Sequence, residues 1–218
     1  MLEDLPLHAR RVGAGQPLLH EGQHPSHCLL LLQGFACRSK TLADGRRQIV
    51  SFHLPGDILD LAGLLLGRMD HEVRALTSAT VALVPGATVL DWVRHRPGLN
   101  LLLWRDMLID ASIWREWVLN VGRRTAHQRV AHLLCELVAR LRAAGLAADY
   151  GCELPVSQVE LADATGLSAV HVNRVVQEMR AEGLIESRGR TLAVREWRGL
   201  RRAAGFDPAY LHPFAAAA

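Results

Sequence analysis

The sequence predicts an α+β protein: an N-terminal β-roll, then a long helix, then a C-terminal winged helix-turn-helix. Three observations predict this order. Short apolar runs separated by turn residues fill residues 16–89, a continuous helical pattern covers residues 97–120, and a helix–glycine–helix–hairpin pattern covers residues 154–194. We therefore divide the chain into a β-roll sensor domain, a dimerisation helix, a winged DNA-binding domain and a tail. These take residues 1–96, 97–122, 123–196 and 197–218.

Composition favours an ordinary globular protein. Half of the 218 residues are hydrophobic and 22% are charged. No apolar run approaches the roughly 18 residues that a membrane helix needs, and the N-terminus has no signal-peptide core, so we expect a cytoplasmic protein with no membrane partner. The four cysteines form no CxxC pair, which predicts neither a metal site nor a disulfide framework.

In the β-roll region, several short apolar runs alternate with Gly, Pro and Asp residues. Asp44-Gly45 is a strong hairpin signal between two of these runs. Strands of this length and spacing are typical of a sandwich or a double-sheet barrel.

The helix from Pro97 to about Asn120 carries a seam at alternating spacings of three and four residues. Its length of nearly three and a half heptads exceeds what a helix needs to pack over the apolar surface of one β-domain. We therefore expect a homodimer interface, the alternative being a helix packed wholly on its own domain. The seam consists of Leu101, Trp104, Leu108, Ala111, Arg115 and Val118.

A further helix is expected from Thr125 to about Leu141, and the connection through Gly145 is the expected hinge to the winged domain. After residue 194 the tail is rich in large apolar residues, five of which precede Pro213. It is too apolar to remain free, so we expect it to fold back onto the winged domain. These residues are Trp197, Leu200, Phe206, Tyr210 and Leu211.

The segment 154–194 predicts DNA binding. Ser157 and Ser168 are natural N-caps of two helices that a turn at Gly166 separates. Gly183 ends the second helix, and Glu186–Arg190 forms a basic hairpin tip. Such a module inserts its second helix into the major groove and grips phosphates beside it, whereas the alternative is an ordinary helical hairpin packed on a small sheet.

The predicted DNA contacts fall into two groups. Small residues beside polar ones line one side of the second helix, where Arg174, Asn173, His171 and Gln177 are expected to face bases, with Ala169 and Val170 among them. Four residues are assigned to contacts with phosphates: Arg188 and Arg190 through their side chains, and Ser157 and Ser168 through the backbone amides at the helix ends that they cap. Residues 174–202 hold eight arginines against four glutamates, a local excess that phosphate binding needs although the net charge is only +3.

The order of these parts resembles the Crp/Fnr (catabolite-activator/fumarate-nitrate-regulator) superfamily of bacterial transcription factors. The most specific motifs are Leu54-Pro55-Gly56-Asp57, Gly166-Leu167-Ser168 and Val172-Asn173-Arg174. The resemblance spans about residues 18–194. It implies a homodimeric regulator on double-stranded DNA with a palindromic operator, in which a small-molecule effector in the β-roll biases the dimer helix between two arrangements.

The cyclic-AMP members of this superfamily carry a glutamate for the ribose and an Arg-Ser or Arg-Thr pair for the phosphate. The matching positions here are Leu61, then Met69 and Asp70, and the adenine contacts fall on Trp114 and Arg115. A leucine cannot accept a ribose hydroxyl and an aspartate repels a phosphate, so cyclic AMP is not expected. The effector pocket is assigned to Asp60, Leu61, Met69, Asp70, His71, Trp114 and Arg115.

No cofactor is predicted. Iron–sulfur members use cysteines near the N-terminus, and residues 1–27 contain none. Haem stays open because of the spacing His20…His24…His27-Cys28, for which a polar turn is the alternative.

An enzyme is not expected either, because a cupin-like metal site usually needs a His-x-His motif and the chain has none. The remaining alternative is a ligand-independent regulator whose pocket Trp114 fills. Activation would need a surface for RNA polymerase, and no motif identifies one.

Overall fold

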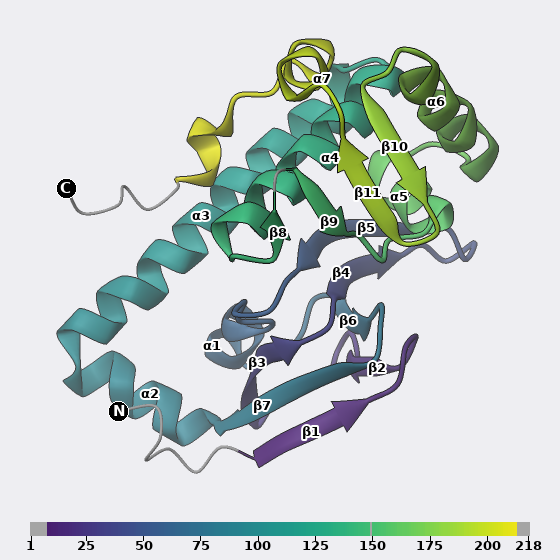
Figure 1. Cartoon of the computed structure of the whole chain (residues 1–218). Helices are drawn as coiled ribbons and strands as arrows, with labels where there is room; N and C mark the ends of the chain where they lie inside the picture. The colour runs from purple at the N-terminus through teal and green to yellow at the C-terminus, as the bar shows by residue number, and fades with distance from the viewer. Residues whose placement is uncertain (1–7, 149, 213–218) are drawn as a thin grey trace. The chain divides into compact units, whose positions relative to one another are not determined.

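The computed structural model describes residues 8–148 and 150–212. The chain divides into two compact units at Leu108–Ile109, inside helix α3 (Pro97–Arg123) (Figure 1). Within the described residues, no helix is both long and apolar enough to cross a membrane.

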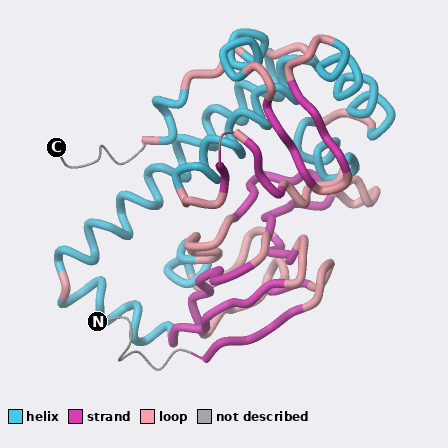
Figure 2. The backbone as a smooth tube through the Cα atoms, viewed as in Figure 1, coloured by secondary structure: helices cyan, strands magenta, loops and turns pink. Residues whose placement is uncertain are grey.

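The first unit contains two antiparallel sheets and two short helices (Figure 2). One sheet has the order β1-β7-β3, from β1 (His8–Val12), β7 (Ala79–Pro85) and β3 (His27–Gln33). The other has the order β2-β6-β4-β5, from β2 (Pro17–Leu19), β6 (Glu72–Ala75), β4 (Ala36–Thr41) and β5 (Arg47–His53). The helices are α1 (Leu61–Leu66) and α2 (Gly86–His95). The predicted β-roll is confirmed.

The roll begins earlier than the sequence pattern indicated, because β1 precedes residue 16. The strand reads HARRV and is almost wholly exposed, so it lacks the alternation of apolar and polar residues that marks a half-buried strand. It is held instead by its backbone pairing with β7, from His8 opposite Leu83 to Val12 opposite Ala79. An edge strand of this kind depends on tertiary pairing and cannot be recognised from periodicity.

Two glycine turns shape the second sheet and its exit, and the first of them was predicted. Strands β4 and β5 form the expected hairpin, in which Asp44 Oδ1 accepts the Arg46 amide at 3.0 Å and Gly45 has φ +87°. At Pro55-Gly56 the chain turns again, with Gly56 at φ +101° and its amide donating to the Leu31 carbonyl. Only glycine adopts these φ values without strain, which is why the two glycines fix the turns.

Two apolar clusters form the core of this unit. The first draws on both sheets and includes Leu31, Val73 and Val81, all fully buried. The second joins α1, α2 and the start of α3 to the sheet through Leu61, Val89 and the other residues of that cluster. Burying a side chain of this size contributes about 1.5–3 kcal/mol to the stability of the folded state.

The second unit is a winged helix-turn-helix built on a long helix. Its helices are α4 (Ala126–Ala143), α5 (Gln158–Thr165), α6 (Ala169–Ala181), α7 (Trp197–Ala204) and the short 3-10 helix η1 (Pro208–Leu211). Its sheet has the order β10-β11-β9-β8, from β10 (Ile185–Arg188), β11 (Thr191–Val194), β9 (Gly151–Glu153) and β8 (Ala147–Ala148). The wing hairpin was predicted, whereas β8 and β9 were not.

The connection at Gly145 is a helix cap and not the expected hinge. Gly145 has φ +71° and donates to the Arg142 carbonyl, while the Leu146 amide donates to the Leu141 carbonyl at 2.8 Å. This paired pattern is a Schellman cap, which closes α4. Because α4 packs against α5, α6, α7, β8 and β9, the cap lies inside one compact unit.

The tail folds onto this unit, as its apolar residues led us to expect. Helix α7 packs against α4, with Leu200 and Phe206 buried. Beyond α7, the Tyr210 hydroxyl donates to Glu136 Oε2 at 2.7 Å, and Trp117 Nε1 donates to the same carboxylate at 3.0 and 3.1 Å. The Glu136 side chain is completely buried, so these two donors replace the water that the carboxylate gives up.

Candidate nucleic-acid interface

Helix α5 begins with a reciprocal capping box. Ser157 Oγ accepts the Glu160 amide at 3.2 Å, and the Glu160 carboxylate accepts the Ser157 amide at 2.5 Å. The amides of Gln158 and Val159 then remain as the first helical donors without an acceptor inside the helix. Together with the helix dipole, they make this N-terminus suitable for an anion.

Helix α6 begins at Ser168, whose Oγ accepts the His171 amide at 3.2 Å. Gly166, at φ +66°, ends α5 in the left-handed region and turns the chain into α6. The two serine caps and the glycine turn predicted from the sequence are therefore all present.

One face of α6 is buried and the other faces solvent. The buried face is apolar and consists of Val172, Val175, Val176 and Met179. On the solvent face Val170 is 82% exposed, Asn173, Arg174 and Gln177 are also exposed, and Ala169 and His171 are half-buried. The residues assigned to bases thus share an accessible helix face, which is the requirement for groove entry.

The polar side chains of this face have weak partners. Arg174 lies 3.8 Å from Glu178 with 67% of its side chain exposed, and Gln177 accepts from Arg180 at 3.3 Å. Asn173 Nδ2 donates to Oε1 of Gln158 at 3.0 Å. An exposed ion pair such as that of Arg174 with Glu178 contributes about 1 kcal/mol or less, so a DNA contact can replace it at little cost. Gln158 was not among the predicted residues, because a contact between two helices leaves no spacing signal.

The wing carries two arginines, Arg190 at its tip and Arg188 at the end of the strand before it. Strand β10 continues through Arg188, so the tip is Gly189-Arg190 and is shorter than the predicted Glu186–Arg190. Both Arg188 and Arg190 are exposed, and no acidic side chain among the described residues lies within ion-pair distance of either. The neighbouring Glu186 is paired with Arg195 at 2.5 Å. The unpaired positive charge is therefore concentrated at the tip.

In the first unit, two of the predicted effector residues lie in the core. Leu61 is buried in the cluster that joins the helices to the sheet. Met69 is buried in the cluster shared by the two sheets, packed so closely onto Gly63 that a Cβ there would meet Met69 Sδ at 2.1 Å. Packing accounts for both residues, and neither presents its side chain to a ligand here.

Asp60 lies at the N-terminus of α1 but does not cap it, because its carboxylate turns inward. Oδ1 accepts the Leu29 amide at 2.8 Å, and burial raises the pKa of Asp60 from 3.8 to about 6. Arg38, which the sequence reasoning missed, is buried beside it and donates to the carbonyls of Leu59 and Ile58 at 3.1 and 3.3 Å. The two charges belong to an internal network.

Asp70 and His71 form a pair at the surface. The carboxylate of Asp70 is largely exposed, and its Oδ1 lies 2.5 Å from Nδ1 of the buried His71 ring. The last two predicted residues, Trp114 and Arg115, are exposed and belong to the second unit.

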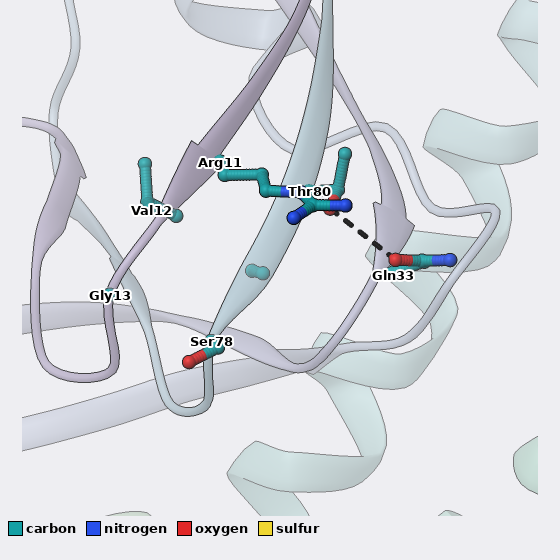
Figure 3. A pocket seen from close by; sticks show the side chains of 7 residues that line it. Arg11, Val12, Gly13, Gln33, Ser78 and Thr80 are labelled. Atoms are coloured by element: carbon teal, nitrogen blue, oxygen red, sulfur yellow. Dashed lines mark hydrogen bonds between the residues drawn. The ribbon is translucent and has the colours of Figure 1, made fainter.

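An open pocket of about 480 Å³ lies at the ends of β1, β7 and β3 (Figure 3). It contains none of the predicted effector residues, and Thr80 Oγ1 donates across it to Gln33 Oε1 at 3.4 Å. Its lining residues are Arg11, Val12, Gly13, Gln33, Ser78, Ala79 and Thr80.

The histidines of the β-roll do not converge. His24 Nδ1 contacts the Gly67 carbonyl at 2.5 Å, His27 Nδ1 contacts Ser26 Oγ at 2.9 Å, and His20 lies 3.9 Å from Glu72. Within the part of the chain that the structure describes, no three His, Cys, Asp or Glu side chains are grouped so that they could hold a metal ion.

The seam predicted on α3 is largely open to solvent. Leu101 is 70% exposed, Leu108 is 62% exposed, and Trp104, Arg115 and Val118 are exposed as well. Ala111 is half-buried. Between them, Leu103 and Ile113 point the opposite way and are buried.

Two family models match the chain in the expected order. A cyclic nucleotide-binding domain matches residues 9–96 and a Crp-like helix-turn-helix domain matches residues 128–203. The second match begins within α4 and ends within α7.

Similar proteins cover nearly the whole chain. The transcriptional activator FnrL of Cereibacter sphaeroides is 29% identical over 91% of this chain and 81% of its own length. The nitrogen fixation regulation protein FixK of Bradyrhizobium diazoefficiens is 32% identical over 81% of this chain and 74% of its own. The solved structure of FixK2 from Bradyrhizobium japonicum has a TM-score of 0.84 at 24% identity, covering 93% of this chain and 100% of that one. With these matches added to the fold and the interface, the chain belongs to the Crp/Fnr superfamily and is a DNA-binding transcriptional regulator of that type.

Proposed function

We propose that this regulator works as a homodimer in the cytoplasm and reads a palindromic operator with two copies of α6. The observation that carries this proposal is the row of large apolar side chains exposed along α3. Leu101, Trp104, Leu108 and Val118 recur at helical spacing, and water-exposed apolar residues in such a row are costly unless a partner covers them. A second copy of the same helix supplies a matching row, and a two-fold dimer matches a two-fold operator.

On the DNA, the roles follow exposure and chemistry. Arg174, Asn173, His171 and Gln177 face base edges, while Val170 and Ala169 offer apolar contact, as to a thymine methyl. Ser157 and Ser168 hold phosphates through the helix amides that they leave open at the starts of α5 and α6. Arg188 and Arg190 grip phosphates beside the groove, which their lack of acidic neighbours supports.

The signal sensed by the β-roll is not cyclic AMP. The residues present do not fit this nucleotide: Leu61, at the ribose position, is an apolar core residue, and the phosphate positions hold a buried methionine and an exposed carboxylate. A carboxylate next to a phosphate anion is repulsive.

No iron–sulfur or other cofactor is assigned, and no catalytic role is proposed. Two of the relatives named above carry regulatory names, since FnrL is called a transcriptional activator protein and FixK a nitrogen fixation regulation protein. Activation would require a contact with RNA polymerase, for which no residue is assigned. The second candidate is a regulator whose β-roll serves only as a scaffold. It is favoured by the burial of Leu61 and Met69 in the apolar core, where the family places effector contacts.

Native mass spectrometry of the purified protein is the first test. A dimer that carries extra mass would identify the effector as haem, a metal or a small molecule, and a bare dimer would favour the scaffold candidate. A bare monomer would refute the dimer and the two-fold operator with it. A binding selection from random duplexes then tests DNA reading, since the proposal requires an inverted repeat with half-sites about one helical turn apart.

A further inference from the structure

The side chain of Gln158 connects the two helices of the helix-turn-helix. Its Oε1 accepts the 3.0 Å hydrogen bond from Asn173 Nδ2, across a separation of fifteen residues. Gln158 is the first residue of α5, and Asn173 lies in the second turn of α6. Both side chains are exposed, so the bond joins two groups on the accessible surface and not two groups in the core.

This bond restricts what Asn173 can offer to a base. A free asparagine can present either its oxygen or its NH₂ group, because the amide rotates. With one hydrogen of Nδ2 donated to Gln158, Asn173 retains one N–H and its carbonyl oxygen. One donor beside one acceptor complements the N7 and N6–H₂ groups of adenine, whereas guanine presents two acceptors and needs two donors.

The other end of Gln158 lies where a phosphate is expected. Among the described residues, its Nε2 group has no hydrogen-bond partner, and it sits at the N-terminus of α5 beside the open amides. Gln158 also lines a small cavity of about 160 Å³ together with Ser157 and Arg190, two of the residues assigned to phosphates. One side chain thus reaches both the base-reading helix and the surface expected to meet the DNA backbone.

We propose that Gln158 is a positioning residue for base readout: it donates from Nε2 to a DNA phosphate and, through Oε1, holds Asn173 in the orientation that reads adenine. This inference rests on the proposed function, in which Asn173 faces bases. The phosphate contact anchors Gln158, and the anchored Gln158 fixes the amide of Asn173 before the groove is entered. Reading then costs less conformational entropy than it would with a free side chain.

The test is a binding selection from random duplexes on the full-length protein and four variants. Gln158→Met keeps the length of the side chain but removes the acceptor and the donor. Gln158→Glu keeps only acceptors, so it can still accept from Asn173, but its charge repels the phosphate. Asn173→Ala removes the reader, and the double variant Gln158→Met/Asn173→Ala completes a cycle that isolates the coupling between the two residues.

We expect the wild type to prefer adenine about tenfold at one position of each half-site. Gln158→Met should lower this preference to about threefold or less and leave the other positions unchanged. Gln158→Glu should keep the preference while binding every sequence more weakly. The double variant should show the same preferences as Asn173→Ala alone. Because Gln158 is exposed, all variants should unfold at the wild-type temperature.

Three outcomes would overturn the inference. In the first, Gln158→Met weakens binding to all sequences equally and leaves the adenine preference intact, which would mean that Gln158 contacts only phosphate. In the second, the position selects guanine, or Gln158→Glu loses the preference, so that the amide of Asn173 points the other way. In the third, the two single variants change the preference additively. A wild-type protein that selects no sequence at all would refute the proposed function itself and is distinguishable from all three.

Discussion

The hydroxyl of Tyr210 gives the sharpest test of how the tail stabilises the second unit. Tyr210→Phe removes one hydrogen bond, of 2.7 Å, to the buried carboxylate of Glu136. The ring contacts stay, because phenylalanine can still stack on His132 at 5.8 Å and meet Phe206 edge-on at 6.0 Å. Trp117 remains as a donor to the same carboxylate.

The expected loss follows from the charge of the acceptor. A hydrogen bond to a charged group contributes about 1.5–3 kcal/mol, and after the substitution the buried Oε2 of Glu136 keeps only the bond from Trp117 Nε1 at 3.0 Å. We expect the free energy of unfolding to fall by about 2–3 kcal/mol. For a protein of this size, that corresponds to a decrease in Tm of roughly 4–12 °C.

The loss should also depend on pH. Burial raises the pKa of Glu136, so lowering the pH protonates this group sooner than an exposed glutamate. Once it is protonated, Tyr210 donates to a neutral acid, and the bond contributes only about 1 kcal/mol. The difference in the free energy of unfolding between wild type and Tyr210→Phe should therefore shrink as the pH is lowered.

Thermal and urea unfolding followed by circular dichroism would measure both effects. Tyr150→Phe is the matched control, because Tyr150 is the only other tyrosine and its ring stacks on Trp197, while no hydrogen bond of its hydroxyl is found among the described residues. The reasoning fails if Tyr210→Phe unfolds like the wild type at pH 8, or if Tyr150→Phe is destabilised equally.

Three further predictions concern DNA reading, pH and assembly. Arg174→Ala should lower the free energy of DNA binding by roughly 1–3 kcal/mol and remove the sequence preference at one base pair per half-site. Arg188→Ala should instead weaken binding to all sequences alike and reduce the salt dependence of binding by about one phosphate contact. An unchanged operator preference for Arg174→Ala in a binding selection contradicts the first assignment. Burial raises the pKa of Asp60 to about 6 from 3.8, so the folded state binds its proton more tightly than the unfolded state does. The free energy of unfolding should therefore fall by about 2–3 kcal/mol as the pH rises from about 4 to 6, and Asp60→Asn should flatten that part of a urea-unfolding pH profile. Leu108→Arg should shift the protein to monomers in sedimentation velocity, and Leu42→Arg, at an equally exposed leucine of the β4–β5 turn, should not; a dimeric Leu108→Arg variant would place the interface elsewhere.

The sequence by itself determined the elements that local rules specify. Ser157, Ser168 and Gly166 set the ends of α5 and α6, because N-caps and left-handed glycines act over three or four residues. Asp44-Gly45 specified the β4–β5 hairpin for the same reason. The buried face of α6 followed from its period of 3.6 residues, and the solvent face that carries Asn173 and Arg174 followed with it.

Tertiary structure decided what depends on partners distant in the sequence. Strands β1, β8 and β9 have no apolar alternation and exist because of backbone pairing: β1 pairs with β7, β9 with β11, and β8 with β9. Gly145 could mark a hinge or a cap, and only the packing of α4 made it a cap. The contacts of Glu136 with Tyr210 and of Gln158 with Asn173 span 74 and 15 residues, so neither leaves a spacing in the sequence. Such contacts form only where folding brings two surfaces together, and that is why local rules identified helix α6 but not the Gln158 side chain that bonds to its Asn173.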